Sequence, residues 1–511
     1  MAGQTGQDKK GLLGRTVYVV VVSLGFGLLF DLFFYEKLPG ISFPLYIMLI
    51  LGGIFVAARY FKTDIPRSAV LLMIPLLFFS CMVFVWAGGF ITFLNIVISL
   101  YLLALILQAV FKPGVRIYNL AAYLRPLYLI PARLIGALRG TILEIGAMRS
   151  MVKKHPALPQ IARGVLIAVP VLALFVMLFA SADLVFRKYV SNLFSFDING
   201  EWLLRTCIIL FVTSALIGIF GYLASKGKEE SAPTIEAEAK ALAEPRGTIE
   251  AAILFGSLNL LFLGFILVQL TYFFGGEQSI AAQGFTYAEY ARKGFFELIA
   301  VAVLSLLLIL GAEKRLLGKS GKHSRWFTLL AAGLVAQVLI IMASAFQRLS
   351  LYESAYGFTT LRALSHLFII WLAVIFGLLL YKIFVDKRES TFAFLAFLSV
   401  LVFLAVINIA NVDAFVARKN IGRYYASGKL DVYYLGDLSD DAVVETAKLL
   451  DGPDPKLGGL AGSLYQKREA LIEKDRYWQS MNISRKAALR ALQAKAHLLE
   501  QETDIRIYNR S

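Results

Sequence analysis

Residues 89–110 read "GFITFLNIVISLYLLALILQAV", a run without a single charged side chain. An apolar run of about 18 residues or more is long enough to cross roughly 30 Å of hydrocarbon as a helix. Because lipid offers backbone amides no hydrogen-bond partners, such a run has to be helical. The stretch therefore predicts a membrane-spanning helix.

The composition indicates that most of the chain follows this example. Of its 511 residues, 58% are hydrophobic and 17% charged, and the mean hydropathy is +0.70. Soluble domains carry about 25% charged residues. The predicted fold class is therefore all-α: a polytopic helical membrane protein with about eleven transmembrane helices and a small helical soluble C-terminal tail. The predicted spans are 16–34, 42–59, 68–86, 89–110, 164–183, 202–224, 249–274, 295–312, 326–347, 363–385 and 391–410.

Lysine and arginine in the short loops predict which side each loop faces, because cytoplasmic loops carry an excess of both. Two loops on the far side, "YEKLPG" at 35–40 and "AGG" at 87–89, are poor in them. Loops on the side of the N-terminus hold Lys9, Lys10, Arg15, Arg59, Lys62, Arg67, Lys314, Arg315, Lys319, Lys322, Arg325, Lys382, Lys387 and Arg388. We expect a cytoplasmic N-terminus over 1–15, and an odd number of spans then places the tail, 411–511, outside.

The segment 111–163 differs from every other loop. From residue 112 it carries nine Lys/Arg against one Glu, interleaved with apolar residues. A spanning helix is disfavoured because Arg133, Arg139 and Glu144 would each cost about 2.5–3.5 kcal/mol at the bilayer centre. The pattern predicts a basic amphipathic segment that binds anionic lipid headgroups on the cytoplasmic leaflet. A docking site for a cytoplasmic partner remains open, and nucleic-acid binding is not expected.

These features divide the chain into consecutive parts. A slightly acidic stretch, 225–248, reads as a flexible cytoplasmic linker. The expected parts are the N-terminus 1–15, spans one to four over 16–110, the basic interfacial segment 111–163, spans five and six over 164–224, the linker 225–248, spans seven to eleven over 249–410, and the tail 411–511.

One polar stretch, "FTYAEYARKGFFEL" at 285–298, stands between two apolar runs. Thr286 and Glu289 have the spacing of a capping box, and Phe285 and Tyr290 that of a hydrophobic staple. The stretch therefore predicts a capped helix that enters the following span.

Polar side chains crowd toward the outer ends of the spans. Ionisable residues at membrane depth usually pair with one another or face a cavity, and Asp31, Glu297, Arg348 and Arg362 most need such partners. The candidate outer-face polar site comprises Asp31, Asp183, Glu289, Arg292, Glu297, Arg348, Tyr352, Tyr356, Arg362, His366, Asn411, Asp413, Asn420 and Arg423. Two interpretations stay open: a salt-bridge network that closes the outer end of the bundle, or a site for a small polar ligand or an envelope protein.

Common catalytic and cofactor motifs are absent from the sequence. Both cysteines, Cys81 and Cys207, lie inside apolar runs, which argues against a disulfide framework or a thiol metal site. We therefore expect no catalytic, cofactor-binding or metal-binding residue. The polar residues expected near mid-membrane, such as Asn259 and Gln337, are uncharged.

The tail past residue 410 has ordinary soluble composition. Asn411 is placed to cap a helix through about Ser427, with Gly428 as its stop. Ser439 is placed to cap a helix through Leu450. Two further helices are expected near 460–477 and 484–500.

Several blocks resemble a bacterial family of multi-pass membrane proteins of unknown function. They are "NIANVDAFVARKNIGRYYASGKLDVYYLGDLSDDAV" from Asn408, "TYAEYARKGFFEL" from Thr286, "RLSLYESAYGFTTLR" from Arg348 and "SADLVF" from Ser181. The resemblance covers roughly the last two thirds of the chain. It implies a protein of the bacterial plasma membrane and brings no activity or catalytic residue.

Three functions remain compatible with these features. The first is non-enzymatic sensing or scaffolding at the bacterial cell envelope, through the outer polar cluster and the tail. The second is transport or flipping of a small or lipid-linked polar molecule, which a polar outer vestibule would favour. The third is a lipid-modifying transferase with Glu297, Asp183 or Asp413 as a base.

Overall fold

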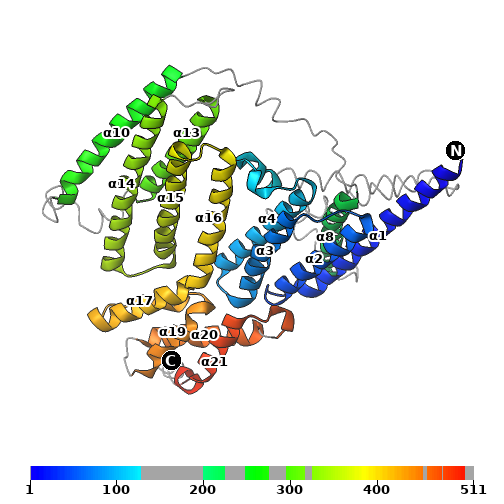
Figure 1. The fold of residues 1–511 in the computed structure, drawn as a ribbon. Coiled ribbons are helices and arrows are strands. Elements are labelled where there is room, and N and C mark those ends of the chain that lie inside the picture. Colours follow the sequence, from blue (N-terminus) through cyan, green and yellow to red (C-terminus); the bar gives the residue numbers. More distant parts are fainter. Residues whose placement is uncertain are drawn as a thin grey trace, which may run out of the picture. The chain divides into compact units, whose positions relative to one another are not determined.

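The structure is a computed structural model that describes residues 2–127, 200–224, 248–274, 295–316, 325–452, 457–474 and 476–500. These residues form helices and connecting loops, and none of them is in a strand (Figure 1). They belong to two compact units. The first comprises Met1–Val115, Ala121–Glu229 and Leu471–Lys486, and the second comprises Arg116–Leu120, Glu230–Ala470 and Ala487–Ser511.

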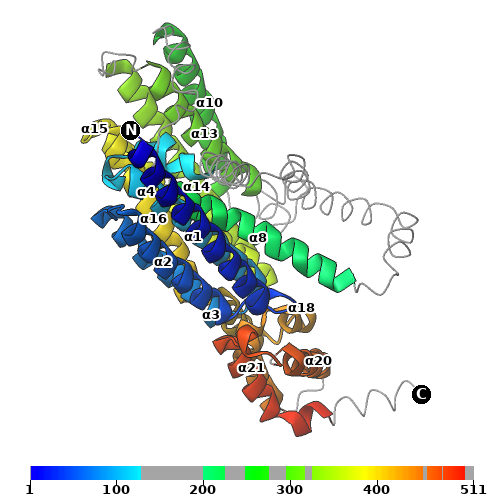
Figure 2. The ribbon, with the colours of Figure 1, turned by 90° about the vertical axis from the view of Figure 1, so that its right-hand side faces the viewer.

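The first unit is built around five long helices. They are α1 (Ala2–Phe34), α2 (Ser42–Phe61), α3 (Arg67–Val85), α4 (Gly89–Phe111) and α8 (Gly200–Ala224). α1 packs along α8, as Figure 2 shows, and α3 packs along α4. Aromatic side chains fill the space between α1 and α2, where Tyr46 lies within ring-contact distance of Phe30 and Phe34 and donates its hydroxyl to the carbonyl of Phe26.

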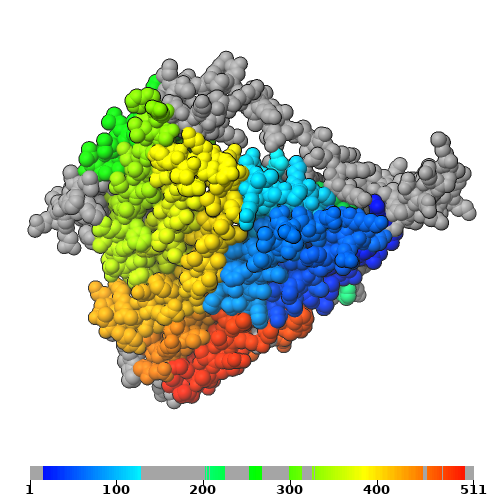
Figure 3. All heavy atoms as spheres, viewed as in Figure 1, coloured from blue at the N-terminus to red at the C-terminus, as the bar shows by residue number. Residues whose placement is uncertain are grey.

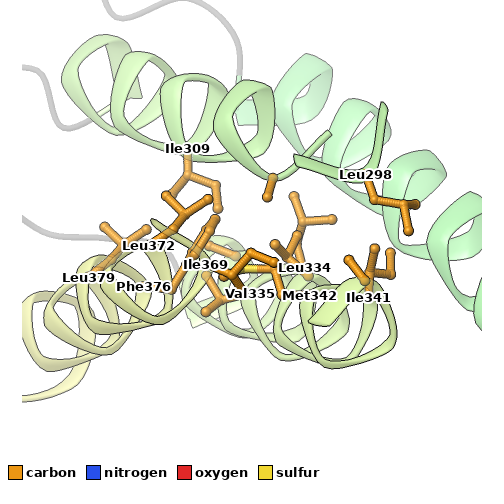
Figure 4. Close-up of a cluster of buried hydrophobic side chains, with 14 of the residues drawn as sticks. Leu298, Ile309, Leu334, Val335, Ile341, Met342, Ile369, Leu372, Phe376 and Leu379 are labelled. Atoms are coloured by element: carbon orange, nitrogen blue, oxygen red, sulfur yellow. The ribbon is translucent and has the colours of Figure 1, made fainter. Parts of the chain in front are cut away.

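The second unit contains α10 (Thr248–Phe274), α13 (Phe295–Leu316), α14 (Arg325–Tyr356), α15 (Thr360–Phe384) and α16 (Glu389–Ala410). Its tail part contains α17 (Val412–Ser427), α18 (Val432–Asp437), α19 (Val443–Thr446), α20 (Gly458–Lys474) and most of α21 (Ile483–Gln493). Figure 4 shows the apolar core, in which Leu334 and Val335 of α14 meet Leu372 and Phe376 of α15. Lipid tails are as apolar as these side chains, so in a bilayer the hydrophobic effect does not drive helices together. Close packing of the side chains is then what stabilises the bundle.

Eight of the predicted spans coincide with apolar helices of the described residues, whereas the predicted count of about eleven is not confirmed. Among the described residues, eight helices are long and apolar enough to cross a membrane. α10 and α13 add shorter apolar stretches, Ile253–Leu267 and Leu298–Ala312. The predicted span 164–183, the linker 225–248 and the basic segment beyond residue 127 lie outside the described residues.

Several helix ends follow the local sequence signals. α14 continues past the predicted boundary to Tyr356, and Gly357 ends it in the left-handed region with φ of +89°. The Asn411 side chain accepts from the Ala414 amide to cap α17, and Gly428 ends that helix with φ of +68°.

The predicted cap at Ser439 is wrong. Its side chain does not cap a helix, and the region splits into a short 3-10 turn at Asp440–Ala442, then α19 and a second turn at Ala447–Asp451. The hydroxyl of Ser439 instead donates to the carboxylate of Asp413. Hydrogen bonds to an ionised acceptor are strong, so the rotamer that points the hydroxyl at Asp413 is favoured over one that points its oxygen at the helix amides.

The core of the second unit generates a test of packing. Phe376→Ala should lower the free energy of unfolding by on the order of 3 kcal/mol, because the ring is fully buried and its removal leaves a cavity. Ile370→Ala on the same helix is the control, since that side chain is 52% exposed. Thermal unfolding of the detergent-solubilised protein measures both. Equal melting temperatures for the two variants would contradict this core.

Candidate functional site

In the first unit, an ion pair joins the end of α1 to the beginning of α8. Arg205 donates from Nη2 to Oδ2 of Asp31 at 2.6 Å and from Nε to Oδ1 at 3.2 Å. The Asp31 side chain is 9% exposed, and the guanidinium lies over the rings of Tyr35 and Trp202 at 4.7 and 5.6 Å. Asp31 thus has the partner that its depth requires, and the bidentate pair fixes both helix ends.

The same unit holds a segment of the tail against its loops. Asn482 is 1% exposed and donates to the carbonyls of Val83 and Trp86, at 3.1 and 2.8 Å, at the end of α3. Gln479 donates to the carbonyl of Leu32 in the last turn of α1 at 3.2 Å. Two tail side chains therefore satisfy carbonyl groups that the helix ends leave without intrahelical partners.

Loop 35–41 completes this contact. The backbone amide of Ile41 donates to the carbonyl of Met481 at 2.9 Å, and that of Leu38 donates to the hydroxyl of Ser480 at 3.0 Å. A Cβ atom on Gly40 would lie 2.4 Å from the carbonyl oxygen of Met481. Only glycine fits here, so the loop and the tail segment are shaped to each other.

In the second unit, α17 holds the loop between α14 and α15. Asn420 forms two hydrogen bonds with the backbone of Phe358: its Oδ1 accepts from the amide and its Nδ2 donates to the carbonyl, each at 2.8 Å. Arg423 donates to the carbonyl of Ala355 in the last turn of α14 at 2.7 Å. Figure 3 shows the atoms of this tail part, in orange, against the ends of the second unit's helices, in yellow and green.

Asp413 is the polar centre of this contact. It is 8% exposed and accepts from the hydroxyl of Thr360 at 2.6 Å and from that of Ser439. The Tyr434 hydroxyl accepts from the Thr360 amide at 2.8 Å, and Thr359 caps α15. Both carboxylate oxygens of Asp413 are therefore occupied by hydrogen bonds that join the tail to the beginning of α15.

Arg362 stabilises the same loop from the other side. Its Nη1 donates to the carbonyl of Gly357 at 2.6 Å, and its guanidinium lies 4.0 Å above the ring of Tyr352. Tyr352 in turn contacts Tyr356, edge to face, with ring centroids 5.0 Å apart. The two tyrosines lie on one face of α14, and the Tyr352 ring binds the Arg362 cation.

A second group of polar side chains in the second unit lies between α14 and α15. The His366 ring lies with Nε2 3.1 Å from the hydroxyl of Ser350 and with Nδ1 3.4 Å from Oε2 of Glu353. Phe346 contacts the imidazole edge to face at 4.4 Å. Sequence analysis missed Ser350 and Glu353, although their spacing from Phe346, four and seven residues respectively, places all three on one face of α14.

Inside the tail, Glu445 links α19 to α17. Burial alone would raise the pKa of Glu445, but hydrogen bonds from Lys448 and Arg418 bring it below the usual value. The two contacts measure 2.6 and 3.3 Å. This charged link supports the tail helix that carries Asp413.

The remaining predicted site residues are placed as follows. Arg348 lies half-buried on α14 and has an interaction partner. Glu297 lies on α13. Asp183, Glu289 and Arg292, with the predicted capping box, fall outside the described residues. Asp31 belongs to the first unit, whereas Arg348, Tyr352, Tyr356, Arg362, His366, Asn411, Asp413, Asn420 and Arg423 belong to the second. Over the described part of the chain, no group of three or more His, Cys, Asp or Glu could hold a metal ion.

Apolar helices of this length and number fit an integral membrane protein. The chain belongs to the family of the domain of unknown function DUF4153, whose family model matches residues 73–449. That range includes the loop between α14 and α15 and its partners on α17, and it ends before α20 and α21. No curated protein and no solved structure matches the chain.

The contact between α17 and the loop generates a second test. Asn420→Ala should destabilise the protein by about 1–3 kcal/mol, because it leaves the amide and carbonyl of Phe358 without partners. Lys419→Ala, an exposed neighbour on the same helix, is the control. Thermal unfolding and the rate of limited proteolysis in the tail report the difference. Indistinguishable values for the two variants would show that the loop does not depend on Asn420.

A double-mutant cycle tests the pair in the first unit. Asp31→Ala and Arg205→Ala should each destabilise the protein, and the double variant should lose less than their sum, with a coupling free energy of roughly 1–2 kcal/mol. Unfolding in detergent at low and high salt measures it. Strict additivity would mean that the two side chains do not interact.

Proposed function

We propose that this protein is a multi-pass protein of the bacterial plasma membrane that acts as a sensing or scaffolding component of the cell envelope. Its tail would be the recognition surface, anchored on the extracytoplasmic ends of the membrane helices. The single observation that carries the proposal is that side chains of the tail hydrogen-bond to helix-end carbonyls, such as those of Leu32, Val83 and Ala355.

The charge of the loops supports an extracytoplasmic tail. In the first unit the tail contacts loop 35–41 and the end of α3, and in the second it contacts loop 357–359. Among these loops the only lysine or arginine is Lys37. The loops at the other helix ends carry Lys62, Arg67, Lys112, Lys382, Lys387 and Arg388. By the positive-inside rule the basic ends are cytoplasmic, so the tail faces the opposite side.

The polar side chains at the contacts of the tail are already engaged in hydrogen bonds, which favours a binding surface over a transport pathway. Asp413, Asn420, Arg423 and Arg362 all make contacts that hold loops and helix ends together. Side chains committed in this way are a poor lining for a vestibule that must open and close. The fixed geometry suits presentation of a surface to a partner.

Polar residues inside the second unit have a similar role. Asn259 of α10 donates to the carbonyls of Phe255 and Leu330, at 2.7 and 3.0 Å, and Gln337 of α14 donates to the carbonyl of Asn259 at 3.1 Å. Interhelical hydrogen bonds of this kind join α10 to α14. They favour a static bundle over the discontinuous helices of many carriers.

On the cytoplasmic side, the basic segment 111–163 is proposed to hold the protein against anionic lipid headgroups. Its net charge supports an attraction of about 1 kcal/mol for each lysine or arginine near the surface. This contact would anchor the bundle while the tail meets its partner outside.

Site-specific photocrosslinking in living cells tests the proposal. A photoreactive amino acid at Tyr433 or Tyr425, which are 79% and 73% exposed, should give one discrete adduct with the same envelope protein from both positions. The control is Leu435, at 1% exposure on the same helix as Tyr433, from which no adduct is expected. If neither exposed position gives an adduct while reconstituted vesicles move a polar or lipid-linked molecule, the protein is a transporter and the proposal fails.

A further inference from the structure

Three side chains near the outer ends of α14 and α15 form a continuous polar chain. Ser350 and Glu353 lie on α14, and the His366 ring of α15 reaches both of them, with Nε2 3.1 Å from the Ser350 hydroxyl and Nδ1 3.4 Å from Oε2 of Glu353. The order is that of a nucleophile, a base and a carboxylate that orients the base. The distance from Ser350 to His366 is within hydrogen-bond reach, and the contact from His366 to Glu353 is a longer one.

The environment of Glu353 decides which ring nitrogen of His366 carries the proton. Its side chain is 7% exposed, and its Oε1 is buried without a hydrogen-bond partner among the described residues. A buried carboxylate needs a donor, so the Nδ1 proton of His366 belongs on the Glu353 side. That tautomer leaves the Nε2 lone pair directed at Ser350.

The Ser350 hydroxyl then has two acceptors for one proton. It lies 3.0 Å from the carbonyl of Phe346, one turn earlier on α14, and 3.1 Å from Nε2 of His366. Rotation of the hydroxyl about the Cβ–Oγ bond turns the proton from the carbonyl to the imidazole while Oγ stays in place. In the second position the hydroxyl oxygen is activated as a nucleophile.

We propose that Ser350, His366 and Glu353 form an acyl-transfer site for carboxylic esters of long acyl chains at the outer bilayer interface. Ser350 lies three residues beyond the apolar run that ends at residue 347, with Arg348 between them. This is the boundary between hydrocarbon and headgroups, where lipid ester groups lie. Ser350 is half-buried, so it lies at the surface of the bundle and is not enclosed in its core.

The reaction has two balanced halves. Oγ of Ser350 attacks the ester carbonyl carbon while its proton passes to Nε2 of His366, and Glu353 stabilises the imidazolium. The tetrahedral intermediate collapses, the ester C–O bond breaks, and the alkoxide leaves with the proton from His366. Water, or the hydroxyl of an acceptor molecule, then gives its proton to His366 and attacks the carbonyl carbon of the acyl-serine. The bond from that carbon to Oγ breaks, Oγ of Ser350 takes the proton back from His366, and the acid or a new ester is released.

This activity goes beyond the proposed scaffolding role and rests on different residues. Asp413, Asn420 and Arg423, which anchor the tail, are not part of the triad. The two proposals can therefore fail independently of each other.

Labelling with a long-chain alkyl fluorophosphonate tests the site directly, because this probe modifies activated serine hydroxyls. The full-length protein in native membranes should be labelled, and peptide mass spectrometry should place the adduct on Ser350. Ser350→Ala should abolish labelling, and His366→Ala should slow it by at least about a hundredfold. Ser354→Ala is the matched control, since that serine is one turn further along α14, and it should label at the original rate.

Two further measurements separate catalysis from a structural role. Added imidazole should partly restore labelling of His366→Ala, which a merely structural histidine would not allow. Glu353→Gln should slow labelling by roughly tenfold or more, and Glu353→Asp should recover part of that loss. Hydrolysis of a long-chain p-nitrophenyl ester in proteoliposomes should follow the same order of variants.

Absence of the adduct from the folded wild-type protein would overturn the proposal, as would an adduct on Ser350 that forms equally fast in His366→Ala. The wild-type result does not depend on whether any variant folds. Monodisperse elution in detergent establishes that each variant used in the comparison is intact.

Discussion

The carbonyl groups at the ends of membrane helices are the constraint on which this architecture depends. The last four carbonyls of a helix lack intrahelical partners, and near the bilayer they cannot rely on water. Here the tail supplies donors to three such ends: Gln479 to α1, Asn482 to α3 and Arg423 to α14. Loss of a donor that is a carbonyl's sole partner costs about 1–3 kcal/mol, whereas the carbonyl of Leu32 also accepts from Nζ of Lys37 at 2.6 Å.

This constraint explains why the tail is folded onto the loops of each unit. A helical module of this size has a small core of its own, and helices such as α19 are only a turn long. Within the first unit, Ser480 accepts from loop 35–41, and within the second unit, Asn420 of α17 bonds to loop 357–359. Each part of the tail thus gains burial from the unit to which it belongs. The polar residues that looked like a ligand site from sequence are in large part the donors and acceptors of these contacts.

The sequence predicts the parts of the fold that are set locally. The apolar runs give the long helices, Gly357 and Gly428 end α14 and α17, and Asn411 caps α17. Each of these depends on residues within a few positions, so the chain nearby contains the whole signal. The depth of Asp31 also correctly indicates that it needs a partner, although only the structure identifies Arg205.

Contacts between distant residues could not be predicted in the same way. Asn482 and Val83 are 399 positions apart, and no periodicity in the sequence connects them. Ser439 has the local signature of a cap, yet its hydroxyl donates a hydrogen bond to Asp413, which is 26 positions away. Glu353 stands in a polar stretch at a helix end, where a carboxylate needs no explanation until the structure shows it buried beside His366.

Reporter fusions after Ser511 test the central claim most directly, since the account requires the tail to lie on the side of the basic-poor loops. Alkaline phosphatase is active only outside the cytoplasm, and green fluorescent protein fluoresces only within it. The account predicts an active phosphatase fusion and a dark fluorescent-protein fusion, with the opposite pair of results for fusions in the loop after Lys62. A fluorescent fusion after Ser511 would contradict it, because the tail and the loops it binds would then be cytoplasmic.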